Sequence, residues 1–385
     1  MATQRSSEAI LDALIAFPTV SRETNLPLIT YAKDYLAGYG IGSHVVSSAD
    51  GQKANLFATI GPDVAGGVVL SGHTDVVPID GQNWSTDPFR LTQRDDRLYG
   101  RGTCDMKSFL AISLAMVPEM LAAGLKRPIH LAFSYDEEIG CLGAPAMIDR
   151  MRETVPRPSA VIVGEPTGMA VVTGHKGVLK MTSRVRGKPV HSSIVDKGVS
   201  ATAYAARLAV WLDDRMRKNR LEGVKDTRFD PPYTTLHSGI IEGGTAFNIT
   251  ARDCLLVSDI RTLPGESSAD YLAEFRAFAD SLASQMREVD PACGIEIDVE
   301  CDVPGCRKEE AGAAEALARH ITGDNGDHVV PYGTEAGQFQ DRGFSVAVCG
   351  PGDMDQAHIP DEYIEISQIR AGEAFQRRLI EHLSV

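Results

Sequence analysis

GGVVLSGHTD, residues 66–75, joins an apolar run to a histidine and an aspartate. The unbroken apolar run predicts a strand buried on both faces, as in a parallel sheet. His73 and Asp75 are two positions apart, so in extended chain their side chains point the same way. Because α/β proteins build their sites where strands end, we interpret this stretch as a sheet strand that delivers polar side chains to a site.

Predicted strands and helices alternate on both sides of this stretch. We expect strands at 55–60, 68–71, 129–135, 160–163 and 344–348, helices at 6–16, 26–38, 106–123, 143–151, 308–321 and 366–383, and a loop at 333–338. This alternation predicts an α/β fold with a largely parallel sheet.

The middle of the chain follows a different order. We expect a strand at 178–186, a helix at 200–218, strands at 235–241 and 249–260, a helix at 267–287 and a strand at 295–301. This β-α-β-β-α-β order is ferredoxin-like. The sequence therefore predicts a catalytic domain formed by residues 1–177 and 304–385, with an inserted α+β domain at 178–303.

The bulk composition excludes some classes of function. The 385 residues carry a net charge of -14, which argues against nucleic acid as a partner. Residues 1–10 lack the apolar core of a signal peptide, and no apolar run is long enough for a membrane span. The seven cysteines are scattered and include no C-x-x-C pair, which favours free thiols and a cytoplasmic location.

Four further motifs carry polar side chains at predicted strand ends or in loops: GRGTCDMK (100–107), DEEIG (136–140), GEPT (164–167) and AHIPDE (357–362). Asp105 follows two glycines and would lie at a helix N-terminus, where a capping carboxylate is the structural alternative. Glu137 and Glu138 directly follow an apolar run. If they continue a strand, they point to opposite faces and can take different roles. A solvated acidic turn is the alternative.

Taken together, the motifs supply ligands for two metal ions. One ion could be held by His73, Asp105 and Glu165, and the other by His358, Asp105 and Glu138. Nitrogen and oxygen ligands of this kind suit Zn2+, and also Co2+ or Mn2+. Each ion would keep an open position, as catalytic metal sites do.

The five motifs resemble those of the M20 metallopeptidase family, in the family's order, and the resemblance covers nearly the whole chain. It implies an amide hydrolase with two Zn2+ ions and Asp105 as the bridging ligand. It also implies that Glu137 is the general base and that Asp75 orients His73. The inserted domain would act as a lid and form a homodimer. His191, in GKPVHS (187–192), would contact the acyl oxygen, often across that dimer.

The resemblance also bears on the substrate, a small N-acyl amino acid. Arg261 and Asn248 resemble residues that hold its α-carboxylate end. The segment Thr334-Glu335-Ala336 resembles the corresponding segment of family members that act on acetylornithine. Glu335 could pair with the ornithine ammonium or orient a group near the metal. We therefore expect N2-acetyl-L-ornithine as the substrate. The alternatives are acetylcitrulline or a neutral acyl amino acid, succinyl-diaminopimelate, a dipeptide, or a non-catalytic binding protein of the same fold.

Overall fold

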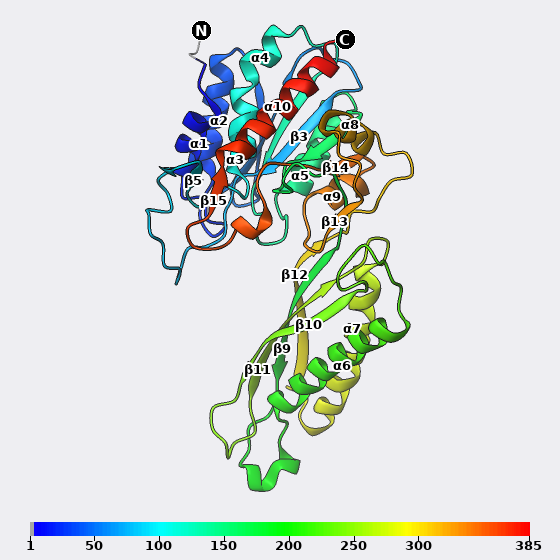
Figure 1. The fold of residues 1–385 in the computed structure, drawn as a ribbon. Helices are drawn as coiled ribbons and strands as arrows, with labels where there is room; N and C mark the ends of the chain where they lie inside the picture. Colours follow the sequence, from blue (N-terminus) through cyan, green and yellow to red (C-terminus); the bar gives the residue numbers. More distant parts are fainter. Residues whose placement is uncertain (1–3) are drawn as a thin grey trace. The chain divides into compact units, whose positions relative to one another are not determined.

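The strand predicted at 68–71 is β3 (Val68–His73), and it lies inside an eight-stranded sheet in the computed structural model, which describes residues 4–385 (Figure 1). β3 is parallel to a neighbour on each side, β6 and β7, and β14 continues the parallel part beyond β7. In sheet order the strands are β1 (Ser43–Ser47), β2 (Ala54–Ile60), β6 (Ile129–Ser134), β3, β7 (Ala160–Val163), β14 (Val346–Val348), β8 (Val172–His175) and β13 (His328–Val330). The carboxyl ends of the parallel strands therefore meet at one edge.

Helices cover both faces of this sheet, which explains why its central strands β3, β6 and β7 are buried throughout. Val68 and Leu70 of β3 belong to a core shared with α1, α3 and α10, while α5 and α9 contact each other and reach β2 and β14. The helices of this unit are α1 (Ser7–Ile15), α2 (Leu26–Gly38), α3 (Lys107–Ala115), α4 (Val117–Ala122), α5 (Ala144–Thr154), α8 (Ala313–Thr322), α9 (Ala336–Asp341) and α10 (Ile366–Leu383). A small sheet adds β15 (Tyr363–Glu365), β5 (Arg97–Tyr99) and β4 (Thr92–Arg94).

A second unit comprises residues 175–305 and 330–333. Its elements are β9 (Val178–Arg186), η1 (Ser192–Lys197), α6 (Ala201–Glu222), β10 (Thr235–Gly243), β11 (Asp253–Arg261), α7 (Ser268–Val289) and β12 (Gly294–Val303). The sheet is antiparallel, in the order β10-β11-β9-β12 (Figure 1). Alternate residues of β9, such as Leu179 and Met181, pack into a core with α6 and α7. The predicted fold class, α/β with a ferredoxin-like unit, is confirmed.

Several predicted elements have different bounds. The single helix expected at 106–123 is wrong: it divides at Met116 into α3 and α4, because Pro118 in the first turn of α4 has no N–H to continue the helix. The strand expected from 249 begins only at Asp253, and the preceding residues form a loop. The helix expected from 308 begins at Ala313.

Other differences concern short elements. The loop expected at 333–338 contains the start of α9, and the strand expected from Phe344 begins at Val346. The short strands β1, β4, β5, β8, β13 and β15 were not predicted. None of the helices within residues 4–385 combines the length and hydropathy that a membrane span requires. Residues 1–3, part of the N-terminal stretch considered above, lie outside the described residues. All seven cysteines are free and buried.

Candidate metal centre

His73 is the last residue of β3 and is completely buried. Its Nδ1 lies 2.9 Å from the backbone carbonyl oxygen of Asp75. A carbonyl oxygen can only accept, so Nδ1 carries a proton and donates it. The other ring nitrogen, Nε2, therefore faces the carboxylates of Asp105 and Glu165, at 2.9 and 3.9 Å. A histidine fixed in this way through Nδ1 presents Nε2 as a metal ligand.

Asp105 lies between the two histidines of the candidate site. Its Oδ1 is 2.9 Å from His73 Nε2, and its Oδ2 is 3.1 Å from His358 Nε2. The capping alternative is not realised, because the N-cap of α3 is Met106 and no side chain caps that helix. Asp105 thus offers one oxygen to each histidine, which is the arrangement expected of a bridging carboxylate.

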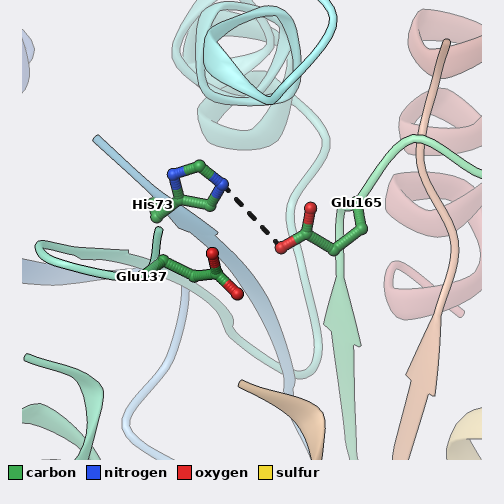
Figure 2. Close-up of side chains that lie close together, drawn as sticks. All are labelled: His73, Glu137 and Glu165. Atoms are coloured by element: carbon green, nitrogen blue, oxygen red, sulfur yellow. Dashed lines mark ion pairs between the residues drawn. The ribbon is translucent and has the colours of Figure 1, made fainter. Parts of the chain in front are cut away.

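Glu137 and Glu138 lie in a turn after β6 rather than on the strand, so the prediction that they point to opposite faces of a strand is wrong. Their separate environments come from the turn. Glu138 Oε2 lies 3.1 Å from His358 Nε2. The carboxylate of Glu137 instead lies close to the side chains of His73 and Glu165, as Figure 2 shows.

Asp75 holds this turn in place. Its Oδ1 accepts a hydrogen bond from the Glu137 N–H at 3.1 Å, and its Oδ2 accepts from the Glu138 N–H at 3.2 Å. Oδ2 also accepts from Ser21 Oγ at 2.7 Å. His73 Nδ1 lies 3.5 Å from Oδ1. A single carboxylate therefore positions the histidine and both glutamates.

Glu165 follows β7 directly, and its placement depends on the glycine before it. A Cβ at Gly164 would lie 2.2 Å from the ring of Phe109, so no other residue fits there without movement. His358 reaches the site from a loop in the last part of the chain. Its backbone has φ of 61°, a conformation uncommon outside glycine.

The electrostatics of the site favour a bound cation. Burial raises the pKa of Glu137, Glu138 and Glu165, and repulsion from the Asp105 carboxylate adds to the rise. Hydrogen bonds with Asp105 and Glu138 raise the pKa of His358 to about 11. Carboxylates crowded in a buried site repel one another unless a positive charge lies among them.

Unpaired carboxylate oxygens are a second observation that supports a metal centre at these residues. Two buried carboxylate oxygens, Glu138 Oε1 and Glu165 Oε1, have no hydrogen-bond partner, although buried polar atoms normally have one. Two groups of side chains could hold an ion: His73 with Glu137 and Glu165, and His73 with Asp105 and Glu138. The donors are imidazole nitrogens and carboxylate oxygens, which suit a divalent cation such as Zn2+.

The other predicted site residues lie elsewhere. Glu335 is buried, and its carboxylate accepts hydrogen bonds from Ser71 Oγ at 3.1 Å and from Ser134 Oγ. Both serines belong to strands that end at the site, so Glu335 supports those strands. The pairing of Glu335 with an ornithine ammonium stays a prediction. The alternative, that Glu335 orients groups near the metal, is compatible with these contacts.

His191, Asn248 and Arg261 belong to the second unit. His191 is exposed, and its Nδ1 lies 2.8 Å from Ser193 Oγ. The carbonyl oxygen of Asn248 accepts from the N–H of Ser192 at 2.9 Å. Arg261 Nε donates to Asp259 Oδ2 at 2.7 Å, so part of its guanidinium is already engaged.

Lys53 and Ser21 support the site without having been predicted. Lys53 Nζ is 2.5 Å from Asp136 Oδ1 and pairs with the first carboxylate of the acidic turn. Ser21 donates to Asp75, as described above, and its carbonyl oxygen accepts from Lys53. Neither residue lies in a motif, so the sequence offered no local signal for them.

The buried His73, the half-exposed His358 and the carboxylates around them converge near the ends of parallel strands and form a candidate metal centre. The chain belongs to peptidase family M20/M25/M40, whose family model matches residues 69–382. A curated acetylornithine deacetylase from Myxococcus xanthus is 33% identical over 379 residues, which are 97% of this chain and 96% of that protein. The chain is therefore a metal-dependent hydrolase of amide bonds.

Two solved structures share the fold. An M20 family metallo-carboxypeptidase from Sulfolobus solfataricus has a TM-score of 0.78 and 18% identity, covering 99% of each chain. A dinuclear metal binding peptidase of the M20 family from Bacillus subtilis has a TM-score of 0.65 and 14% identity, covering 98% of this chain and 97% of that one. At these identities the likeness concerns the fold.

Proposed function

We propose that the chain is a two-zinc deacylase of N-acyl-L-amino acids, and that its substrate is N2-acetyl-L-ornithine. The observation that carries the metal assignment is the position of Asp105, with one oxygen toward His73 and the other toward His358. In this proposal His73 and Glu165 hold one Zn2+, Glu138 and His358 hold the other, and Asp105 bridges them. Co2+ could replace Zn2+ at such ligands.

When bound, the two ions would supply Lewis acidity, which lowers the pKa of water and polarises an acyl carbonyl. The protein's own contribution to proton transfer is assigned to Glu137. Burial raises the pKa of Glu137 above its usual value, which makes its carboxylate a stronger proton acceptor, and the protonated group can then return the proton to the leaving amine. Asp75 keeps Glu137 in place through the backbone hydrogen bond described above.

Substrate contacts are assigned to the second unit. We propose that His191 donates a hydrogen bond to the acyl oxygen, and that Arg261 and Asn248 bind the α-carboxylate end. The exposure of His191 leaves its ring accessible to a ligand, and the Arg261 guanidinium retains donors beyond its Nε bond to Asp259. Arginine matches a carboxylate through two parallel hydrogen bonds.

A homodimer through the second unit is also proposed. β10 is an edge strand of its sheet, and Ile240 and Ile241 on it are more than half exposed. Phe247, in the loop that follows, is fully exposed. An apolar edge strand is an aggregation hazard unless another chain covers it. Analytical ultracentrifugation of the wild type and of Phe247→Asp tests this: a monomeric wild type would refute the dimer.

The substrate assignment rests on the 33% identity to the acetylornithine deacetylase, which makes N2-acetyl-L-ornithine the first choice and arginine biosynthesis the corresponding pathway. The test is a panel of acetylornithine, acetylcitrulline, acetylmethionine and succinyl-diaminopimelate, assayed with Zn2+-loaded enzyme. We expect the highest kcat/KM for acetylornithine. A clear preference for another member of the panel would replace the substrate while leaving the reaction class intact.

A further inference from the structure

A buried ion pair lies beside the candidate metal centre. Arg101 Nη1 is 2.6 Å from Glu362 Oε2, and each side chain is only 1% exposed. Removing two charges from water is costly, and their attraction offsets that cost only if further hydrogen bonds satisfy both groups. The remaining contacts of the pair therefore indicate what it does.

Glu362 contacts the backbone at the proposed bridging ligand. Its Oε1 accepts hydrogen bonds from the N–H groups of Cys104 and Asp105, at 2.9 and 3.1 Å. Both N–H groups precede α3, in a bend where the helix provides no partner for them. The Glu362 carboxylate thus fixes the main chain that presents Asp105 to the two histidines.

Arg101 contacts the loop of the other ligand, His358. Its Nη1 lies 3.4 Å from the carbonyl oxygen of Ile359, and its Nη2 donates to Gln82 Oε1 at 2.5 Å. Gln82 Nε2 in turn donates to the carbonyl oxygen of His358 at 2.9 Å. The indole of Trp84 donates to the same Gln82 oxygen, and the guanidinium lies 5.0 Å from the Trp84 ring centre.

The two sets of contacts join the backbones of Asp105 and His358 through a single ion pair. We propose that Arg101 and Glu362 are positioning residues that set the separation of these two side chains for one metal ion. The positive φ of His358 costs some free energy, and the hydrogen bonds to its loop help to hold that conformation. The inference rests on the proposed function, since it takes Asp105 and His358 as ligands.

The test measures metal binding rather than turnover. Full-length protein freed of metal by chelation is titrated with Zn2+ by calorimetry and with Co2+ by visible absorption. Glu362→Gln keeps an oxygen for the two N–H groups but removes the charge that faces Arg101. We expect one of the two Zn2+ ions to bind 10- to 100-fold more weakly, the range typical when residues supporting a ligand are changed.

Glu373→Gln is the matched control. Glu373 is also a buried carboxylate, and it contacts Ser7 and Arg370, neither of which is part of the site. We expect Glu373→Gln to bind two Zn2+ ions as the wild type does. Thermal unfolding of both variants without metal separates a loss of stability from a loss of metal affinity.

Two more variants make the result decisive. Gln82→Ala removes the link from Arg101 through Gln82 to the His358 backbone and the acceptor of the Trp84 indole, and it keeps the ion pair itself. It decides the question if Glu362→Gln does not fold: wild-type Zn2+ binding in Gln82→Ala would then overturn the proposal. Asp105→Asn tests the ligand assignment itself. If Asp105→Asn weakens binding and Glu362→Gln does not, the positioning role is wrong while the proposed function stands. If Asp105→Asn binds as the wild type, the proposed ligand set fails, and the positioning role fails with it.

Discussion

The hydrogen bonds of Asp75 predict how an Asp75→Asn variant will behave. Its two oxygens receive only donors from the turn and the histidine: the N–H of Glu137 on Oδ1, the N–H of Glu138 on Oδ2, and His73 Nδ1 near Oδ1. An asparagine must place its NH2 group on one of these two sides. Whichever side it takes, a donor then faces a donor.

The smaller loss comes when the NH2 group replaces Oδ2. Ser21 can then reverse its role and accept, while the remaining oxygen keeps the Glu137 N–H, so only the Glu138 N–H loses its partner. One hydrogen bond to a charged group contributes about 1.5–3 kcal/mol. Because about 1.4 kcal/mol corresponds to a tenfold rate change, we expect kcat/KM to fall about 10- to 100-fold.

The assay compares kcat/KM, metal content and thermal unfolding for wild type, Asp75→Asn, Ser21→Ala and the double variant. Ser21→Ala alone should have the mildest effect, because it removes one hydrogen bond and leaves the charge of Asp75. In the double variant the NH2 group introduced at position 75 also lacks the Ser21 hydroxyl as its acceptor. The loss of kcat/KM in the double variant should therefore exceed the combined losses of the two single variants. Wild-type kcat/KM in Asp75→Asn would refute the assignment of this carboxylate as the support of the acidic turn.

Three further predictions follow from the same structure. Glu137→Gln should lose nearly all turnover while metal analysis still finds two ions per chain; substantial activity would contradict the role of Glu137 as base. Gly164→Ala should lower the free energy of unfolding by about 1–3 kcal/mol and weaken Zn2+ binding, because the new methyl group meets the Phe109 ring; denaturant titration and calorimetry check this. Burial lowers the pKa of His130 to about 4 in the folded protein, whereas its pKa in the unfolded chain is about 6.5. As the pH falls below about 6.5, the unfolded chain therefore binds a proton at His130 before the folded protein does. The free energy of unfolding should therefore fall by about 3 kcal/mol between pH 6.5 and pH 4 on account of His130 alone, and His130→Asn should show a shallower slope in denaturant titrations over that range.

Several residues of the candidate site, among them His73 and Glu165, could be predicted because each ends or directly follows a strand, whereas Asp105 and His358 lie in loops and were found through their motifs. A run of apolar residues that ends in His73 or Glu165 indicates both a buried strand and a polar group at its end. Strands that run in parallel bring such ends to one edge, so short motifs far apart in the chain predict one site. The order of elements likewise predicted the βαββαβ unit.

The supporting contacts could not be predicted because they depend on packing between distant segments. Glu335 and Ser71 are 264 positions apart, and no local pattern indicates which buried hydroxyl a glutamate will meet. Lys53 lies in an ordinary stretch, and its role depends on the turn that brings Asp136 near it. The division between α3 and α4 was available from Pro118, but the continuous apolar pattern across it favoured one helix.

The chain order of the sheet has a consequence for biosynthesis. β14 lies between β7 and β8, and His358 follows it, although every other proposed ligand precedes the second unit. Roughly 190 residues separate Glu165 from His358. At synthesis rates of about 5–20 residues per second, His358 is added roughly 10–40 s after Glu165. Until then the sheet lacks β14, so the proposed metal site can be completed only when this last part of the chain has been synthesised.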